Sequence, residues 1–405
     1  MPTAMTESFT LPTPSSRLSS LPAYVFAALD AKKAELAPKL KAEKGYDVID
    51  LGIGSPDAQT PQEIVDAITS GAQNPANHRY PNFKGKPEFR QAIANWVERR
   101  YGVTLNAETE VLPLIGAKEG LAHLTLAYVE PGTVSLVPSP YYPVHGRATW
   151  IAGGEPYPLP LTPENNFLPE LDKVPADVLK KAKLLFLNFP HNPTAAVADL
   201  TYYEKAVAFC KQHNLILVSD LAYADIGFDG YQPPSVLQVP GAKDVAIEFH
   251  SFSKSFNMAG WRLGYVVGNP QLIANLYAVK SNMDYGVCNA IQDGGTFALN
   301  NAERLIPPQV AMYQERRDIA MAGFAKLGWQ TPAPKASMYL WLPIPRCCAT
   351  SWDWTNKLLE TCGVIVSPGS AFGDAGEGFF RISLVASPEV LHEVLRRMEQ
   401  AGITF

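Results

Sequence analysis

The sequence predicts an α/β protein, with a mostly parallel central sheet in a large domain and a second, smaller α/β domain. Short apolar segments of strand length alternate with segments of helical spacing through the middle of the chain, a pattern typical of a parallel sheet. Polar residues recur where these apolar segments end, and beyond about residue 330 the pattern changes to short strands and helices. A chain of 405 residues also exceeds the usual size of one compact core.

The composition excludes several classes of function. The chain is 47% hydrophobic and 18% charged, and its net charge of -5 indicates no large nucleic-acid-binding surface. No apolar run is long enough to span a bilayer. The five cysteines have no CxxC spacing, so we expect reduced thiols in a cytoplasmic protein and no metal site. From the charge and the lack of a long apolar run we expect no nucleic-acid or membrane partner.

The two ends of the chain differ in character. Residues 1–20 are rich in Ser, Thr and Pro and have no apolar core segment, which predicts a flexible arm rather than a signal peptide. The expected division of the chain is an arm of residues 1–17, a small domain of residues 18–55 with 295–405, and a large domain of residues 56–294.

The first hundred residues predict three helices and one strand. Thr60 is the expected cap of the second helix, with Pro61 at its first position and Glu63 at its third. Gly54 follows the strand and either admits a ligand close to the backbone or forms a plain turn. Tyr80 lies in an aromatic, Gly-containing loop that we expect to be ordered and exposed. The expected elements are helices at 22–41, from 60 onward and at 86–101, and a strand at 48–51.

The middle of the chain supplies the predicted central sheet. Its expected strands are residues 111–115, 133–137, 184–187, 215–218, 245–249 and 263–267, with helices at 116–129 and 199–213. Five polar residues follow strand ends, namely Tyr142, Asn192, Asp220, Tyr223 and Lys254. Each has a purely structural alternative, such as a turn, a helix cap or a core aromatic. Because ligands bind beyond the carboxyl ends of parallel strands, their joint occurrence favours a binding site.

Two segments predict an anchor for a phosphate and an amine. Gly116, Ala117 and Lys118 form a turn between a strand and a helix, whose free N–H groups attract anions. Lys254 lies among small hydroxyl residues and precedes Arg262. A cofactor that needs both an imine-forming amine and a phosphate anchor is pyridoxal 5′-phosphate (PLP). The alternative for the lysine segment alone is a serine-rich turn with a chance lysine.

The last third of the chain predicts the smaller domain. Expected helices are residues 270–280, 290–299, 307–327, 352–362 and 388–401, and expected strands are residues 338–342, 364–366 and 378–384. Pro307 and Pro308 are the expected start of the longest helix. Arg381 lies in an otherwise apolar strand, where it either pairs internally or binds an anion.

Four motifs carry a resemblance to a known family. They are Asn192-Pro193-Thr194, Asp220-x-x-Tyr223, Ser251-x-Ser253-Lys254 and Arg262 eight residues later. In this order and spacing the chain resembles the PLP-dependent class I/II aminotransferases of fold type I, from about Arg17 to the C-terminus.

The resemblance implies roles for individual residues. Lys254 would hold PLP covalently and move a proton between the substrate Cα and the cofactor, while Asp220 would pair with the pyridine nitrogen. Tyr223 and Asn192 would bind the phenolic oxygen, and Tyr142 would stack on the ring. The implied phosphate ligands are Ala117, Lys118, Ser251, Ser253, Arg262 and, from the partner of a homodimer, Tyr80. The implied substrate-carboxylate ligands are Arg381, Gly54 and Asn192.

The chain also departs from the family pattern at three positions. Ala117 stands where the family often has Ser, which removes one hydroxyl contact to the phosphate. Ala195 and Tyr141 stand where it often has Gly, and Tyr141 could narrow the pocket.

Residues 21–26, 77–81, 116–120 and 249–254 resemble the branch that holds LL-diaminopimelate and bacterial alanine aminotransferases. The resemblance implies transfer of an amino group between an L-amino acid and a 2-oxo acid, with glutamate and 2-oxoglutarate as one pair. LL-diaminopimelate is the favoured donor, which would place the protein in lysine biosynthesis; alanine and aspartate are the alternatives. A PLP-dependent C–S lyase would use the same motifs, and an amino-acid-sensing domain is a third possibility.

Overall fold

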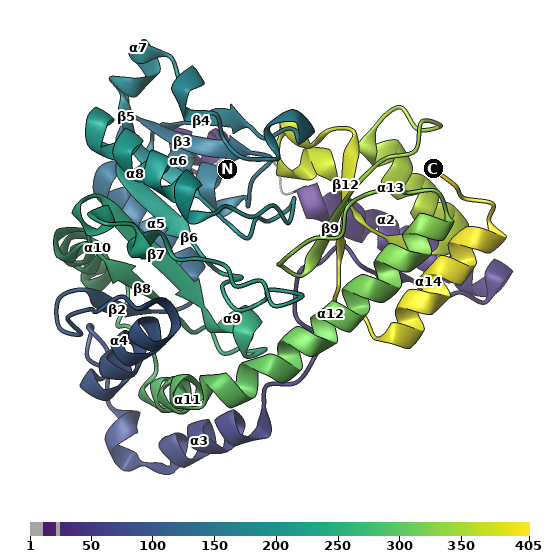
Figure 1. Cartoon of the computed structure of the whole chain (residues 1–405). Helices are drawn as coiled ribbons and strands as arrows, with labels where there is room; N and C mark the ends of the chain where they lie inside the picture. Colours follow the sequence, from purple (N-terminus) through teal and green to yellow (C-terminus); the bar gives the residue numbers. More distant parts are fainter. Residues whose placement is uncertain (1–10, 22–24) are drawn as a thin grey trace, which may run out of the picture.

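The structure is a computed structural model that describes residues 11–21 and 25–405. It consists of a larger body around a seven-stranded sheet and a smaller body around a three-stranded sheet (Figure 1). The predicted boundaries near residues 55 and 294 stay a prediction. Most of the predicted arm, residues 1–10, and the predicted start of the first helix, residues 22–24, lie outside the described residues.

The larger sheet is mostly parallel, as predicted. Its strand order is β2-β8-β7-β6-β5-β3-β4, and only β8 runs antiparallel to its neighbours β7 and β2. The strands are β2 (Val111–Leu114), β3 (Val134–Ser139), β4 (Glu155–Pro160), β5 (Ala182–Leu187), β6 (Ile216–Asp220), β7 (Ala246–Ser251) and β8 (Gly264–Gly268).

The sequence did not predict β4. Its segment Glu155-Pro-Tyr-Pro-Leu-Pro160 contains three prolines, which normally argue against a strand. It is nonetheless the edge strand and pairs only with β3. Proline is tolerated there because an edge strand needs only one of its two rows of backbone groups for the ladder.

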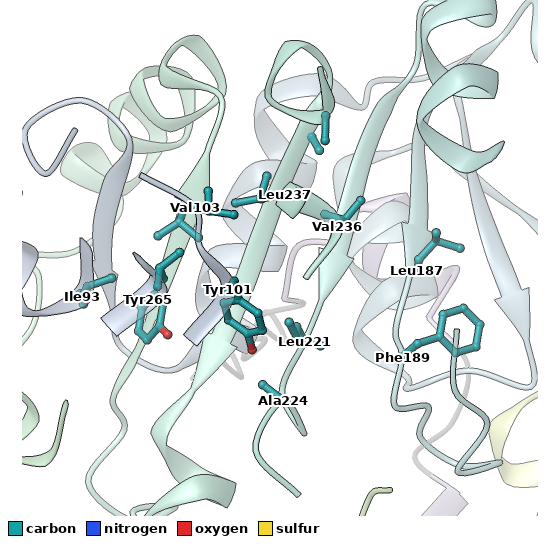
Figure 2. Packing of buried hydrophobic residues seen from close by; sticks show 14 of the residues in the cluster. Ile93, Tyr101, Val103, Leu187, Phe189, Leu221, Ala224, Val236, Leu237 and Tyr265 are labelled. Atoms are coloured by element: carbon teal, nitrogen blue, oxygen red, sulfur yellow. The ribbon is translucent and has the colours of Figure 1, made fainter. Parts of the chain in front are cut away.

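Helices cover both faces of this sheet because its strands are apolar on both sides. Leu185 and Leu187 of β5 belong to a core shared with α4 and α8, which Figure 2 shows from nearby. Leu184 and Phe186 of the same strand point into a second core shared with α5, α6 and α10. The helices of this body are α3 (Gln62–Gln73), α4 (Pro87–Tyr101), α5 (Ala117–Tyr128), α6 (Val144–Ala152), α7 (Ala176–Leu179), α8 (Leu200–His213), α9 (Phe252–Ser255), α10 (Pro270–Met283) and α11 (Asn289–Asn300).

The smaller body has an antiparallel sheet of order β11-β12-β9, and the short pair β1-β10 ties the N-terminal segment to it. Its strands are β1 (Ile49–Asp50), β9 (Tyr339–Pro343), β10 (Val364–Ile365), β11 (Ser367–Pro368) and β12 (Phe379–Ser383). Its helices are α2 (Val25–Lys44), α13 (Ser351–Cys362) and α14 (Pro388–Gln400); a short α1 (Ser16–Ser19) precedes them in the chain.

The longest helix, α12 (Ala302–Lys326), joins the two bodies (Figure 1). The prediction that it begins at Pro307 was wrong, because both prolines lie inside it. Interior prolines remove backbone hydrogen bonds. The helix nevertheless persists, because Leu305 and Ile306 are buried in the core of the larger body, whereas Tyr313 and Phe324 are buried in that of the smaller one.

Within the part of the chain that the structure describes, no helix has the combination of length and apolar character needed to cross a membrane.

Candidate active site

The predicted site residues meet at the carboxyl edge of the large sheet. A cavity of about 200 Å³ is lined by Gly54, Ala117, Lys118, Tyr142, Asn192, Asp220, Tyr223, Ser251, Ser253, Lys254 and Arg262. A second cavity of about 530 Å³ shares Gly54, Lys118, Tyr142 and Asn192 with the first and is also lined by Arg381. Residues from seven separate segments therefore surround these two adjoining cavities, and only Tyr80 of the predicted set lies elsewhere.

Lys254 lies on α9, the single helical turn that follows β7. Its Nζ donates a hydrogen bond of 2.6 Å to the backbone oxygen of Gly54. Burial lowers the pKa of the amine, Tyr339 partly opposes this, and the positive charges of Arg381 and Arg262 lower it further. A lowered pKa increases the fraction of neutral amine, which is the form that attacks a carbonyl carbon.

Asp220 is the last residue of β6 and is 3% exposed. Its Oδ2 lies 3.0 Å from Nε2 of His145, whose ring stacks on Phe186. Its Oδ1 is buried and has no hydrogen-bond partner among the described residues. A buried carboxylate oxygen without a donor is costly, so this oxygen is suited to accept a hydrogen bond from a bound group.

Asn192 connects two parts of the site. Its Nδ2 lies 3.3 Å from the Tyr223 hydroxyl, and its Oδ1 accepts a 2.8 Å hydrogen bond from Nη1 of Arg381. The Tyr223 hydroxyl also lies 2.9 Å from that of Tyr339. Burial, and next the neighbouring Tyr339, raise the pKa of Tyr223 well above its usual value. Tyr223 is therefore protonated near neutral pH and can donate a hydrogen bond.

Arg381 is 4% exposed and forms hydrogen bonds within the protein. Its guanidinium donates to Asn192 Oδ1, the Gly52 backbone oxygen and Ser367 Oγ, all of them neutral acceptors. No Asp or Glu within residues 11–21 and 25–405 forms an ion pair with it. The guanidinium lies 4.3 Å from the ring centroid of Tyr339 and 4.6 Å from that of Phe372. A buried cation without a counterion favours binding of an anion.

The N-terminus of α5 and the guanidinium of Arg262 lie next to each other at the smaller cavity. Gly116 precedes α5 with φ +78°, and a Cβ built there would lie 2.5 Å from Nη2 of Arg262. Arg262 in turn donates a 2.8 Å hydrogen bond to the backbone oxygen of Ala259. The free N–H groups at the start of a twelve-residue helix and an adjacent guanidinium are suited to a phosphate.

Thr60 supports this site instead of capping a helix, so the cap prediction was wrong. Helix α3 begins at Gln62, and the side chain of Thr60 makes no cap hydrogen bond. Its hydroxyl donates to the Asn257 backbone oxygen at 2.7 Å and accepts from Trp261 Nε1 at 3.1 Å. These partners lie in the loop that carries Lys254 and Arg262, and they draw the hydroxyl away from α3.

Tyr80 lies outside both cavities. It is 79% exposed, and its ring stacks on Tyr285 with 4.3 Å between centroids. Its predicted role in a partner's phosphate site stays a prediction.

Sequence reasoning missed four residues that the structure places around the site. Tyr339 and Ser367 come from strands of the smaller body, 116 residues from Tyr223 and 14 residues from Arg381 along the chain. Phe372 packs on Arg381, and His145 pairs with Asp220. The only local signal was for His145, which closely follows the segment that carries Tyr142; the others are brought in by long-range packing.

The residues fit PLP, which the sequence predicts as cofactor. The open Oδ1 of Asp220 matches the protonated ring nitrogen, and the Tyr223 hydroxyl and Asn192 amide match the phenolic oxygen. The Gly116–Arg262 site matches the phosphate, and the Lys254 amine lies in the same cavity.

Gly116→Ala is expected to weaken PLP binding by roughly tenfold or more, because a methyl group would collide with the guanidinium of Arg262. Gly102→Ala is the matched control, since Gly102 has φ +69° and a Cβ added there would meet no atom within 4 Å. Both variants should lose about 1 kcal/mol of stability to backbone strain. Equal PLP affinities in a fluorescence titration of the two apoproteins would contradict the assignment of this turn.

Comparison with known proteins gives a consistent picture. The family described as aminotransferase class I and II matches residues 46–398. The chain is 47% identical to LL-diaminopimelate aminotransferase 2 of Trichormus variabilis over 96% of this chain and 98% of that protein. It is 48% identical to the LL-diaminopimelate aminotransferase of Aquifex aeolicus, over 95% and 98% respectively.

Solved structures agree in fold over nearly the whole chain. Substrate-bound BacF from Bacillus subtilis superposes with a TM-score of 0.91 at 38% identity, covering 98% of this chain and 99% of that one. An aspartate aminotransferase double mutant from Thermus thermophilus has a TM-score of 0.89 at 28% identity, covering 96% and 100%.

Proposed function

The chain belongs to the PLP-dependent class I and II aminotransferases, and from this premise we propose that it is an LL-diaminopimelate aminotransferase that uses 2-oxoglutarate as acceptor. The reaction type rests on three groups that line adjoining cavities. They are the Lys254 amine, whose pKa is lowered, the buried Asp220 Oδ1, which has no hydrogen-bond partner, and Arg381, which has no counterion among the described residues. The relatives named for this substrate support the choice of donor.

Each chemical task of the reaction has a candidate residue in this chain. Bound PLP supplies an electron sink for the bond broken at the substrate Cα. Arg381 binds the α-carboxylate with its planar fork, and Asn192 holds that fork in place. Lys254 accepts the proton from the substrate Cα and donates it to the cofactor. Asp220, oriented by His145, keeps a positive charge on the ring nitrogen.

The larger cavity supports a long donor with charged groups at both ends. Its volume is about 530 Å³, and besides Arg381 its lining includes Ile151 and the charged residues Asp30 and Arg147. LL-diaminopimelate carries a second ammonium and a second carboxylate at its far end. The charged side chains of Asp30 and Arg147, which have opposite signs, can therefore bind that end, whereas alanine would leave them without ligand contacts.

Absorbance of lysine-bound PLP tests the donor directly. The purified enzyme is mixed separately with LL-diaminopimelate, glutamate, alanine and aspartate, without any oxo acid. We expect the visible band to bleach with LL-diaminopimelate and glutamate and to persist with the other two. Bleaching by alanine but not LL-diaminopimelate would identify an alanine aminotransferase, and release of pyruvate and ammonia from a β-substituted amino acid would identify a lyase.

The homodimer and the role of Tyr80 belong to the same proposal. Tyr80 is exposed and stacks on Tyr285, which is also exposed, as is Met283 two residues before it. An exposed aromatic cluster of this kind is typical of a protein interface. We therefore assign Tyr80 to the phosphate site of the partner subunit.

Mixed dimers of two defective variants test this assignment. In a dimer of Tyr80→Ala and Lys254→Ala subunits, one site contains both an intact lysine and the intact tyrosine of its partner. Remixing the two subunits at limiting PLP is therefore expected to restore activity above that of either parent. If Tyr80 served its own subunit, no site would be intact and the mixture would show no gain.

We also infer a cytoplasmic location. All five cysteines are free thiols, which supports a reducing compartment.

A further inference from the structure

Two adjacent cysteines outside the active site face the surface of the smaller body. Cys347 and Cys348 lie in the loop between β9 and α13, Cys347 exposed and Cys348 half-buried. Their Sγ atoms are 3.8 Å apart, and Nζ of Lys357, from α13, lies 3.4 Å from Sγ of Cys347. The remaining cysteines are each isolated in the sequence: Cys288 is exposed, and Cys210 and Cys362 are buried.

The surroundings shift the pKa values of the two thiols in opposite directions. Slight burial raises the pKa of the Cys347 thiol, but its hydrogen bonds with Cys348 and Lys357 outweigh this and bring the pKa below its usual value. Burial, followed by the neighbouring Cys347, raises the pKa of Cys348. The Cys347 thiol therefore ionises more readily than that of Cys348, and the thiolate is the nucleophilic form.

We propose that Cys347 and Cys348 form a redox site that closes to a disulfide when a hydroperoxide oxidises it and reopens with a dithiol reductant. The Cys347 thiolate attacks one peroxide oxygen, breaks the O–O bond and becomes a sulfenic acid as water or alcohol leaves. The Cys348 sulfur then attacks the Cys347 sulfur, and the S–O bond breaks. The hydroxyl leaves as water with the Cys348 proton, so two thiols and one peroxide give one disulfide and two hydroxyl products.

The position of the pair in the chain favours reversibility. Neighbouring Cα atoms across a trans peptide are about 3.8 Å apart, which is below the usual range of about 4.4–6.8 Å for bridged cysteines. The bridge is therefore strained and accessible, and such disulfides are readily reduced. The 3.8 Å separation of the two Sγ atoms makes attack within the pair faster than encounter with a second protein molecule.

The sequence around the pair allows a direct test by mass spectrometry. Trypsin cleaves after Arg346 and Lys357, and the released peptide contains both cysteines and no other. The reduced holoenzyme is treated with hydrogen peroxide, quenched with iodoacetamide and digested. We expect this peptide to lose two hydrogens and take no alkyl group, while the Cys288 peptide is still alkylated. Dithiothreitol added before the quench should restore two alkylated cysteines.

Three variants isolate the contributing groups. Cys348→Ser should stop at a sulfenic acid on Cys347 that dimedone traps. Lys357→Gln should slow closure several-fold, as counted by alkyl groups on the intact protein, because it removes the ammonium beside Cys347. Lys326→Gln, another exposed lysine, is the matched control and should close at the wild-type rate.

Three results would overturn the proposal. One is a fully alkylated 347–357 peptide at peroxide doses that already oxidise Cys288. Another is a bridge that joins two protein molecules instead of the two neighbours. The third is equal closure rates in the Lys357 and Lys326 variants, which would remove the basis for the reactivity of Cys347.

Discussion

Lys254→Ala is expected to abolish turnover, with a loss of at least about 10⁴-fold in kcat. The substitution removes the nucleophile of the 200 Å³ cavity and the base that moves the Cα proton, and proton transfer by a positioned side chain alone contributes about 10²–10⁴-fold. The measurement is glutamate formation from LL-diaminopimelate and 2-oxoglutarate, with bound PLP quantified in the same sample.

Lys254→Arg separates chemistry from charge. Arginine retains the positive charge but is not deprotonated in proteins, so this variant should be as inactive as the alanine variant. Lys173→Ala, a change at an exposed lysine paired only with Glu170, should have wild-type activity. More than a trace of turnover in either Lys254 variant would remove Lys254 from the proposed reaction.

Arg381→Ala is expected to lower kcat/KM for every amino acid donor by roughly 30- to 5,000-fold. Truncating one partner of a buried, hydrogen-bonded charge pair costs about 2–5 kcal/mol, and here the pair forms when the substrate carboxylate meets the guanidinium. The loss should appear mainly as a raised KM, because the carboxylate is bound in both ground and transition states.

Arg381→Lys tests whether the planar fork matters. Lysine keeps the charge but cannot bind the carboxylate in two places or hold Asn192 at the same time, so we expect activity between those of wild type and the alanine variant. A loss confined to one donor would contradict a general carboxylate site. So would an alanine variant with unchanged KM for both LL-diaminopimelate and glutamate.

The sheet and most of the site could be predicted because they depend on local pattern. Each predicted strand of the large sheet is present within two residues of its expected bounds, since apolar runs between turns identify buried parallel strands. Asp220 and Lys254 follow such runs directly, and the parallel arrangement brings strand ends together. The family and cofactor predicted from the motifs are confirmed by the comparisons.

The failures arise where distant packing overrides local preference. The prolines of β4 and α12 locally disfavour a strand and a helix, yet both elements form. β4 forms because it is an edge strand, and α12 forms because residues at both of its ends are buried. Thr60 has the sequence of a helix cap, but its hydroxyl binds a loop nearly two hundred residues later. Tyr339 reaches the site only because the smaller body packs over the sheet edge, which no short motif encodes.

The antiparallel strand β8 has a mechanical consequence for the cofactor site. Because Ser251 of β7 pairs with Gly264 of β8, the segment between them leaves and re-enters the sheet at the same edge. The amine of Lys254 and the guanidinium of Arg262 are thus carried by one loop with both ends clamped, and Thr60 fixes its middle. Both ends of this loop and its middle are held in place, so the loop sets the distance between the Lys254 amine and the Arg262 guanidinium. An inserted or deleted residue would therefore move one of these groups relative to the other.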